Sequence, residues 1–313
     1  ISDGSGGWYI GGDFTQVGGQ TRNRLARINS DGSLHAWNPD ADGTVNTLEL
    51  NSGVVYAGGA FNQIGGQARR KVAALDAATG APTAWIGPDL INGTISTLKR
   101  SGSSIYVCGN FSYMGPDEPY GAAINTSTGA PNLAYLNPNG NVRAAIADGS
   151  GGWYIGGEFT QVGGQTRNYL ARINSDGSLN AWNPDANSHV YTLALSGSTV
   201  YVGGAFGYIG GQSRSYLAAL SASTGLATAW NPSPDYFVHT LAVSVSTVYA
   251  GGLFTYIGGQ ARNYLAALNA TTGLATAWNP SANSFVNTLA VSGSTVYAGG
   301  NFTTVGGQYR GSI

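Results

Sequence analysis

The chain has 313 residues, a formal net charge of −1 and only 9% charged residues, against about 25% in an average domain. So few Lys and Arg residues cannot build the basic surface that nucleic-acid binding requires. No apolar run reaches the length of a membrane-spanning helix, and an apolar fraction of 42% excludes a disordered chain.

The polar residues are mainly Ser, Thr, Asn and Gly, with 49 Gly in total, rather than Lys and Glu. This composition is typical of extracellular surfaces, so we expect a secreted or cell-surface protein. No signal sequence is recognisable at Ile1, so we expect it to have been removed or to lie outside this chain. The single cysteine, Cys108, excludes an internal disulfide framework and is expected to be a small buried thiol.

A repeat anchored by the motif Gly-Gly-x-Phe runs through the chain. From the first anchor to the last there are 288 residues over six intervals, a mean period of 48. Residues 3–41 and 148–186 are identical at 36 of 39 positions, which indicates a recent duplication of a three-repeat segment. Repeats of this length predict an architecture in which each repeat packs on its neighbours. The anchors are Phe14, Phe61, Phe111, Phe159, Phe206, Phe254 and Phe302.

Each repeat contains four candidate strands, which in the last complete repeat are 238–245, 247–254, 263–270 and 274–280. They are rich in Val, Thr and Tyr, as strands are. Tight turns join the first strand to the second and the third to the fourth, and a longer connection with Gly-Gly-Gln joins the second to the third. Asn-Pro ends the fourth strand, because proline has no N–H for a β-ladder. No stretch has a helical period, so almost no helix is expected.

A period of about 40 to 50 residues with four strands is typical of a β-propeller blade. We therefore predict an all-β chain in which residues 1–313 form one β-propeller domain of seven four-stranded blades, with six blades as the alternative. Both ends of the chain fall inside a blade, so the blade at the seam is predicted to be incomplete. Since unpaired strand edges invite pairing, we expect that the chain is a fragment of a longer one or that another segment or subunit supplies the missing strands.

A tryptophan recurs in the fourth strand of most repeats. Blade-to-blade packing is expected there rather than ligand stacking. These residues are Trp37, Trp85, Trp182, Trp230 and Trp278.

The Gly-Gly-Gln connection holds a glutamine and an arginine two residues apart in six repeats. Their donors and acceptors suit the hydroxyls of sugars or carboxylates, which makes them candidate ligand-binding residues. A pair repeated so regularly also suits a structural role, in which both side chains tie the connection to backbone carbonyls of the adjacent Asn-Pro turn. The pairs are Gln20 and Arg22, Gln67 and Arg69, Gln165 and Arg167, Gln212 and Arg214, Gln260 and Arg262, and Gln308 and Arg310.

The connection from the fourth strand to the next repeat varies, and specificity often resides in variable loops on a constant scaffold. Asp235 and Tyr236, beside Phe237, form the most unusual cluster and are further candidates for ligand binding. Asp40 and Asp42 resemble part of a calcium loop, but so short a motif is weak evidence, and we predict no metal site and no cofactor.

The sequence contains no recognisable catalytic constellation. The three histidines and three glutamates are scattered over different repeat positions, and no nucleophile elbow, HExxH motif or phosphate loop occurs. We therefore predict that the protein is not an enzyme. Five Asn-x-Ser/Thr sequons are candidate glycosylation sites: Asn92, Asn110, Asn125, Asn269 and Asn301.

The repeat pattern VxTLAVSGSTVYAGGxFTxxGGQxRNxLAALNATTGxxTAWNP resembles the bacterial delta-60 repeat, a β-propeller repeat of secreted and cell-surface proteins. The resemblance covers nearly the whole chain, and its specific parts are GGxF, GGQxR and AWNP. The third repeat departs from it at residues 114–123 (MGPDEPYGAA) and 134–138 (AYLNP). The resemblance implies a propeller at the cell surface and no assigned catalytic activity.

Taken together, these patterns predict a non-enzymatic extracellular propeller that acts in structure, assembly or adhesion, as a filament or surface-layer subunit does. Its partners are expected to be other protein subunits, through the open seam, or glycans, with no nucleic acid and no membrane insertion. The alternative is a lectin-like propeller with several equivalent loop sites, which would bind weakly at each site and gain strength from multivalency.

Overall fold

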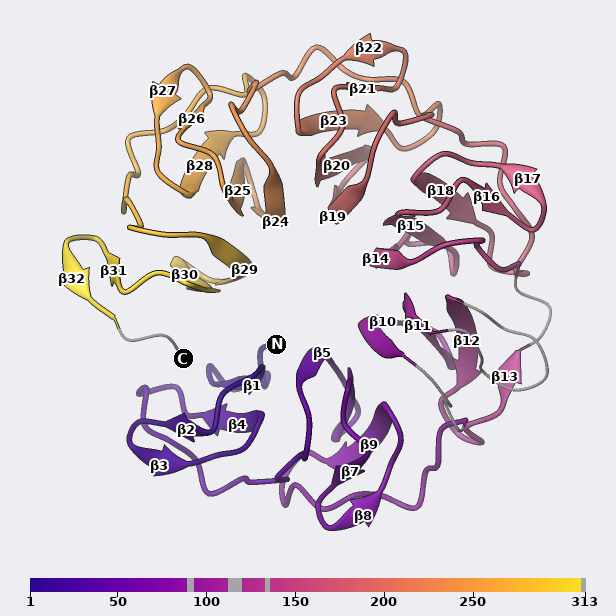
Figure 1. Ribbon diagram of the computed structural model, residues 1–313, viewed down its shortest axis with the longest axis vertical. Coiled ribbons are helices and arrows are strands. Elements are labelled where there is room, and N and C mark those ends of the chain that lie inside the picture. Colours follow the sequence, from indigo (N-terminus) through magenta and orange to yellow (C-terminus); the bar gives the residue numbers. More distant parts are fainter. Residues whose placement is uncertain (89–92, 112–119, 133–135, 311–313) are drawn as a thin grey trace. The chain divides into compact units, whose positions relative to one another are not determined.

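Short strands joined by tight turns make up the regular structure of residues 1–88, 93–111, 120–132 and 136–310, which are the residues that the computed structural model describes (Figure 1). No helix occurs among them, as the absence of a helical period predicted. The described part of the chain accordingly has no helix with the length and hydropathy needed to cross a membrane.

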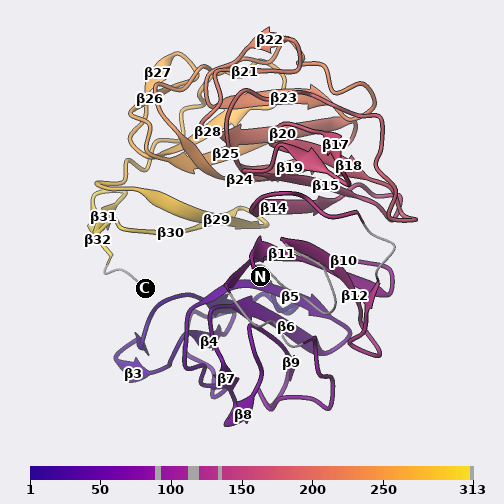
Figure 2. The ribbon, with the colours of Figure 1, turned by 45° about the vertical axis from the view of Figure 1, so that its right-hand side comes forward.

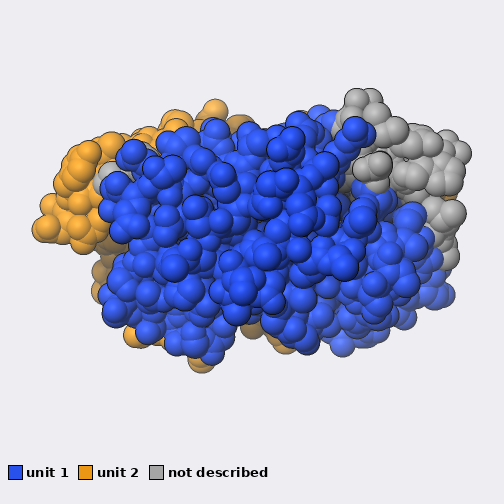
Figure 3. All heavy atoms as spheres, turned by 90° about the horizontal axis from the view of Figure 1, so that it is seen from below, with its two compact units in different colours: residues 1–152, 175–178 blue, residues 153–174, 179–313 orange. Residues whose placement is uncertain are grey.

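The chain divides into two compact units (Figure 3). Unit 1 comprises residues 1–152 and 175–178, and unit 2 comprises residues 153–174 and 179–313. The strands of unit 1 are β1 (Trp8–Gly11), β2 (Gln16–Val17), β3 (Gln20–Thr21), β4 (Leu25–Ile28), β5 (Val45–Asn51), β6 (Val54–Gly59), β7 (Gln63–Ile64), β8 (Gln67–Ala68), β9 (Val72–Asp76), β10 (Thr94–Ser101), β11 (Ser104–Asn110), β12 (Gly121–Asn125), β13 (Pro131–Asn132) and β14 (Val142–Ala147).

Unit 2 repeats the same order of elements. Its strands are β15 (Trp153–Gly157), β16 (Gln161–Val162), β17 (Gln165–Thr166), β18 (Leu170–Ile173), β19 (Val190–Ser196), β20 (Thr199–Gly204), β21 (Tyr208–Ile209), β22 (Gln212–Ser213), β23 (Leu217–Ser221), β24 (Val238–Ser244), β25 (Thr247–Gly252), β26 (Tyr256–Ile257), β27 (Gln260–Ala261), β28 (Leu265–Asn269), β29 (Val286–Ser292), β30 (Thr295–Gly300), β31 (Thr304–Val305) and β32 (Gln308–Tyr309).

The main sheet of a repeat has three antiparallel strands, as in β19-β20-β23, β24-β25-β28 and β5-β6-β9. Its central strand is the predicted second strand, which is apolar along its length because sheets pack on both of its faces. Glycine in this strand permits close approach of the next sheet, because a Cβ on Gly251 would lie 2.6 Å from Cγ1 of Val286 in the following repeat.

The predicted fourth strand is mostly absent as a strand. In β10-β11-β12-β13 a two-residue fourth strand is present, but elsewhere the segment makes one isolated bridge, such as Leu220 to Ala227 or Leu268 to Ala275. The ladder stops because other groups take the backbone atoms of the segment. The carbonyl of Thr276 accepts from Arg262, and the Thr276 hydroxyl accepts from the N–H of Trp278.

The Gly-Gly-Gln connection, predicted as a plain loop, is a second small hairpin in six repeats. Strands of two residues, such as β26 and β27, pair across Gly258 and Gly259. Both glycines have positive φ, at 61° and 80°, which is the backbone of a type I′ turn and explains the paired glycines. Apolar periodicity cannot reveal strands this short, whereas the Gly-Gly signal was present in the sequence.

Within each unit, the sheets of consecutive repeats pack against one another. In unit 2, β19 and β20 lie against β24, and β24 and β25 lie against β29 (Figure 2). Threonine in the first strand adds a hydrogen bond between neighbouring sheets, because the hydroxyl of Thr192 accepts from the N–H of Leu241 at 3.1 Å and that of Thr240 accepts from Leu289 at 3.1 Å. The core of the fold therefore lies between repeats as well as within them.

Candidate functional site

The repeated arginines are bound into the scaffold. In five repeats the Nη2 atom donates to a backbone carbonyl 13 or 14 residues further on, at the start of the segment that replaces the fourth strand. The bonds run from Arg22 to His35 (3.0 Å), Arg69 to Thr83 (3.1 Å), Arg167 to Asn180 (2.9 Å), Arg214 to Thr228 (2.7 Å) and Arg262 to Thr276 (2.7 Å).

Arg214 and Arg262 are the most enclosed of these side chains, at 9% and 7% exposure. Each also donates from Nη1 to the carbonyl of the residue before it, at 2.8 Å. Arg310, in the last repeat, is exposed and donates to the carbonyl of Tyr309 at 3.2 Å. Guanidinium groups held in this way tie the small hairpin to the main sheet, so the geometry favours the structural interpretation of the arginines.

The glutamines divide into two groups. Gln67, Gln212 and Gln260 accept a hydrogen bond from Nη2 of the arginine two residues later, at 2.8, 2.6 and 2.9 Å. The other three glutamines are exposed on the second strands of their hairpins: Gln20, Gln165 and Gln308. Their role as ligand-binding residues stays a prediction.

The side chain of Asp235 accepts hydrogen bonds from the backbone of a loop, and the residue at its position does the same in four repeats. Its Oδ1 accepts from the N–H groups of Thr255 (2.8 Å) and Tyr256 (2.9 Å), and its Oδ2 accepts from the Thr255 hydroxyl at 2.6 Å. Partial burial pushes the pKa of Asp235 upward, but these hydrogen bonds overcome it, so that the pKa lies below its ordinary value.

The equivalents of Asp235 in other repeats are Asp42, Asn187 and Asn283, and each accepts from the two corresponding N–H groups. The carboxylate of Asp42 is thus used to hold a loop. Among the described residues, no three or more His, Cys, Asp or Glu side chains gather where they could hold a metal ion.

A second contact links the Gly-Gly turn to the preceding repeat. Gly210 donates from its N–H to the carbonyl of Pro184 at 2.7 Å, and Gly258 donates to that of Pro232 at 2.8 Å. The Asn-Pro turn is therefore a docking point for the next hairpin, besides ending its own strand.

The recurring tryptophans pack between repeats, as predicted. Trp230 is 4% exposed, lies edge-on to Tyr201 with ring centroids 5.1 Å apart, and donates from Nε1 to the carbonyl of Asn269 in the next repeat at 3.0 Å. Trp37, Trp85 and Trp182 make the same pair of contacts, each to a tyrosine and to a carbonyl of the next repeat.

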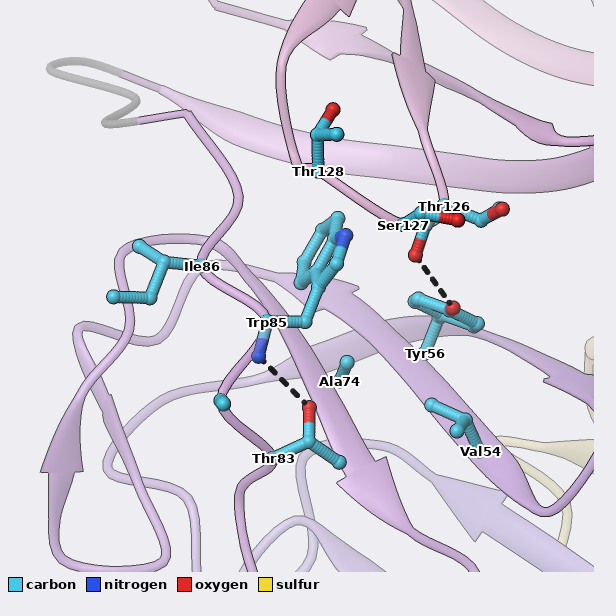
Figure 4. Close-up of a pocket in the computed structure, with 10 residues that line it drawn as sticks. Val54, Tyr56, Ala74, Thr83, Trp85, Ile86, Thr126, Ser127 and Thr128 are labelled. Atoms are coloured by element: carbon cyan, nitrogen blue, oxygen red, sulfur yellow. Dashed lines mark hydrogen bonds between the residues drawn. The ribbon is translucent and has the colours of Figure 1, made fainter.

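A hollow of about 570 Å³ adjoins one of these pairs in unit 1 (Figure 4). Trp85 and Tyr56 line it, together with the turn from Thr126 to Thr128. Figure 4 shows the Tyr56 hydroxyl bonded to the carbonyl of Thr126, at 3.4 Å. The hollow lies between the sheets of two repeats, and none of the residues that line it is charged.

A smaller polar hollow of about 290 Å³ lies on the loops of unit 1. Asn23, Arg24, Asp40 and Asp42 are among the residues that line it. Two of these side chains have partners, since Asn23 donates to Asp40 at 2.7 Å and Arg24 contacts Asp13, which is outside the lining, at 2.9 Å.

The titratable groups with shifted pKa values serve turns or are buried. Hydrogen bonds from the N–H of Ser5 and from Arg27 overcome the effect of burial and lower the pKa of Asp3 to about 2. Burial raises the pKa of the Cys108 thiol, and the side chain is fully enclosed, as predicted. Of the glutamates, Glu49 contacts Lys99 at 3.3 Å, and Glu118 lies outside the described residues.

The sequence analysis missed a position in six repeats, directly before strands β4, β9, β12, β18, β23 and β28. The residue there has φ between 62° and 68° and is not glycine. Its N–H donates to the carbonyl of the anchor phenylalanine, as Tyr216 does to Phe206 at 2.8 Å. The residues are Arg24, Lys71, Tyr120, Tyr169, Tyr216 and Tyr264, so among the described residues the position is cationic at two places in unit 1 and tyrosine at three places in unit 2.

Two of these tyrosines, Tyr169 and Tyr216, belong to a continuous group of rings in unit 2, which we call the aromatic surface. Tyr169 contacts His189 (ring centroids 5.5 Å apart), His189 contacts Tyr191 (6.4 Å), and Tyr191 contacts both His239 (5.4 Å) and Phe237 (6.2 Å). Phe237 in turn contacts Tyr216 (5.4 Å) and Tyr236 (4.3 Å). The aromatic surface thus consists of Tyr169, His189, Tyr191, Tyr216, Tyr236, Phe237 and His239.

The aromatic surface joins residues that the sequence placed apart. His189 and His239 come from different repeats and different repeat positions, yet both rings contact Tyr191. Of the predicted ligand-binding residues, the surface contains Tyr236. The signal available in the sequence was the aromatic residue before the first strand of three consecutive repeats, at His189, Phe237 and Phe285.

Four of the five sequons lie within the described residues, and Asn92 lies outside them. Asn125 and Asn269 each accept two backbone N–H bonds in a turn through Oδ1. Asn301 is exposed and accepts from Asn287 at 2.9 Å, and Asn110 is exposed at a strand end. Glycosylation at these positions stays a prediction.

Comparison with known proteins points to the same fold. A family model described as "Domain of unknown function (DUF5122) beta-propeller" matches residues 4–34 and 149–181, which lie in the two nearly identical segments. No curated protein matches the chain.

Two solved structures resemble the chain at low sequence identity. The computationally designed Ika8 protein is 14% identical, with a TM-score of 0.61 over 90% of this chain and 76% of that one. The WD40 beta propeller domain of Doa1 is 12% identical, with a TM-score of 0.54 over 85% of this chain and 81% of that one. These matches, with the strands described above, support an all-β, propeller-like fold and a β-propeller repeat family for this chain.

Proposed function

We propose that the chain is a non-enzymatic propeller of the delta-60 repeat type, with seven blades, that acts outside the cell by surface contact, in adhesion or assembly. The observation that carries the proposal is the distribution of exposed apolar side chains. Ten large apolar side chains are exposed among the described residues; Ile86 lies in unit 1 and the other nine lie in unit 2.

The exposed side chains recur at equivalent places in consecutive repeats. Tyr208 and Tyr256 occupy one hairpin position at 45% and 46% exposure, and Leu226 and Leu274 occupy one turn position at 60%. In unit 1 the hairpin position holds Gln16 and Gln63, with Tyr113 of the third repeat outside the described residues, and the turn position holds Ala81 and Ala130. Since the scaffold tolerates polar or small residues there, the large apolar ones serve contact with another molecule.

The remaining polar groups give little support to catalysis or to a lectin with repeated Gln/Arg sites. Arg214 and Arg262 are enclosed and bonded to carbonyls, and the carboxylate of Asp235 holds a loop. An extracellular location is supported by the composition, which favours Ser, Thr, Asn and Gly over Lys and Glu. The partners proposed are therefore other protein subunits or glycans.

The test measures self-association and adhesion together. Light scattering over a concentration series reports the mass of the chain, and retention on immobilised copies of the chain and on insoluble polysaccharides such as cellulose and chitin reports adhesion. We expect oligomers or retention on at least one of these supports. A chain that stays at 32.1 kDa at every concentration and is retained on none of them contradicts the proposal.

A variant that gives unit 2 the residues of unit 1 identifies the surface. Tyr208→Gln and Tyr256→Gln, combined with Leu226→Ala and Leu274→Ala, are expected to reduce association or retention at least tenfold without loss of stability. The matched control is Gln63→Ser, at the same hairpin position in unit 1, which is expected to have no effect. Unchanged contact in the fourfold variant would remove the observation on which the proposal rests.

A further inference from the structure

We propose that the aromatic surface of unit 2 binds an uncharged carbohydrate chain by stacking. This proposal rests on the proposed function and gives a ligand class for its adhesive form. It starts from the ring-to-ring contacts that join Tyr169 to Tyr236 through His189, Tyr191 and Phe237.

The fold itself does not require aromatic residues at these places. The position of His189 and Phe237, just before the first strand, holds Thr44 and Thr94 in unit 1. The position of Tyr191 and His239 holds Asn46 and Ser96. Because two repeats of unit 1 have small polar residues at both of these backbone positions, and Asn287 replaces the ring in the last repeat of unit 2, folding does not require the rings.

The aromatic surface is open to a ligand. Tyr236 is 45% exposed, and the side chain of His189 is 44% exposed. The other rings are half-buried. Large amphipathic rings offer stacking area at low conformational cost and carry polar atoms at their edges, which is why they are frequent in binding sites.

The charged groups at the aromatic surface limit the classes of ligand that it can bind. None of the seven side chains is Lys or Arg, and Glu158 places a carboxylate beside them, with its Oε1 3.9 Å from Nδ1 of His189. A phosphate or carboxylate ligand would find no permanent cation here, and single-stranded nucleic acid needs a basic groove beside its stacking rings.

A neutral sugar chain fits both features of the aromatic surface. The axial C–H groups of a pyranose pack on ring faces, while its hydroxyls donate to and accept from phenol and imidazole groups such as those of Tyr191, Tyr236 and His239. The contacts extend over three consecutive repeats, from Tyr169 to Tyr236, so an oligosaccharide fits the row of rings better than a monosaccharide does.

The experiment titrates the intact chain with neutral hexasaccharides of glucose (β-1,4 and α-1,4), N-acetylglucosamine, xylose and mannose by isothermal calorimetry. At least one is expected to bind. The test variant combines Phe237→Thr with Tyr191→Asn, residues that unit 1 carries at these positions. It is expected to weaken binding at least tenfold, whereas the control Gln63→Ser, in unit 1 and outside the aromatic surface, leaves the affinity unchanged.

A measurement on the unmodified chain guards against misfolding of the variant. Addition of the bound hexasaccharide is expected to shift aromatic ¹³C resonances of tyrosine and phenylalanine in the wild-type protein, and Tyr236→Phe is expected to retain binding. Failure of every hexasaccharide to bind, or full affinity in the Phe237→Thr/Tyr191→Asn variant, overturns the inference. If the chain still self-associates or adheres in that case, the proposed function survives while the carbohydrate assignment fails.

Discussion

Arg262→Ala separates a scaffold arginine from a ligand-binding one. Arg262 is 7% exposed and donates at 2.7 Å to the carbonyl of Thr276, at 2.8 Å to that of Ala261 and at 2.9 Å to Gln260. A hydrogen bond to a charged group is worth about 1.5–3 kcal/mol. The Thr276 carbonyl, half-buried, loses its charged partner in the variant, whereas the exposed Ala261 and Gln260 regain water.

An opposing effect reduces the loss. The Nε atom of Arg262 is buried and has no hydrogen-bond acceptor among the described residues, an arrangement shared by Arg22, Arg69, Arg167 and Arg214. Removing such an unpaired donor raises the free energy of unfolding by about 1 kcal/mol or more. The lost packing of the aliphatic stem lowers it by a similar amount. We therefore expect a net destabilisation of about 2 kcal/mol.

The assay is urea unfolding of the wild type, Arg262→Ala and the control Arg310→Ala, monitored by tryptophan fluorescence and by circular dichroism. Arg310 occupies the same repeat position but is exposed, so its substitution is expected to change stability by less than about 0.5 kcal/mol. An Arg262→Ala variant as stable as the control would refute the structural role and favour the interpretation of the repeated arginines as ligand-binding residues.

Three further substitutions test single features of the fold. Asp235→Asn removes a carboxylate whose pKa is lowered by hydrogen bonds such as those from Thr255. The wild type should therefore be more stable than the variant by a constant amount above about pH 4, the ordinary aspartate pKa, and this difference should shrink below that pH. A difference in thermal midpoint that stays constant from pH 6 to pH 3 would contradict this. Val245 has φ 51° in an exposed turn, so Val245→Gly is expected to raise the free energy of unfolding by about 1 kcal/mol, and a lower thermal midpoint would refute the strain. Trp230→Phe removes the bond to Asn269 but keeps a ring, with an expected loss of about 1–3 kcal/mol in chemical denaturation; an unchanged midpoint would show that the bond contributes nothing.

The sequence was most informative for core residues that occur at the same position of successive repeats. The anchor phenylalanines and the tryptophans were placed correctly, because each does the same task in most repeats and therefore leaves a periodic signal. The buried environment of Cys108 followed from its place in a central strand.

Other features left no such signal. The fourth strand was overpredicted because its alternation is that of a strand, while the threonine hydroxyl and the arginine that take its backbone groups act across the fold. The aromatic surface was missed because its members occupy different repeat positions and meet only when neighbouring sheets stack. Tyr216 and Phe237, for example, are 21 positions apart in sequence and their ring centroids are 5.4 Å apart.

The central claim is that residues shared by the repeats hold the scaffold, whereas the aromatic side chains of unit 2 make the contacts. The most direct test measures stability and binding on the same two variants, Arg262→Ala and Phe237→Thr. The account predicts that Arg262→Ala lowers the free energy of unfolding and keeps the affinity per folded molecule, while Phe237→Thr keeps the stability and weakens the binding. The reverse pattern, with binding lost in Arg262→Ala and stability lost in Phe237→Thr, would contradict it.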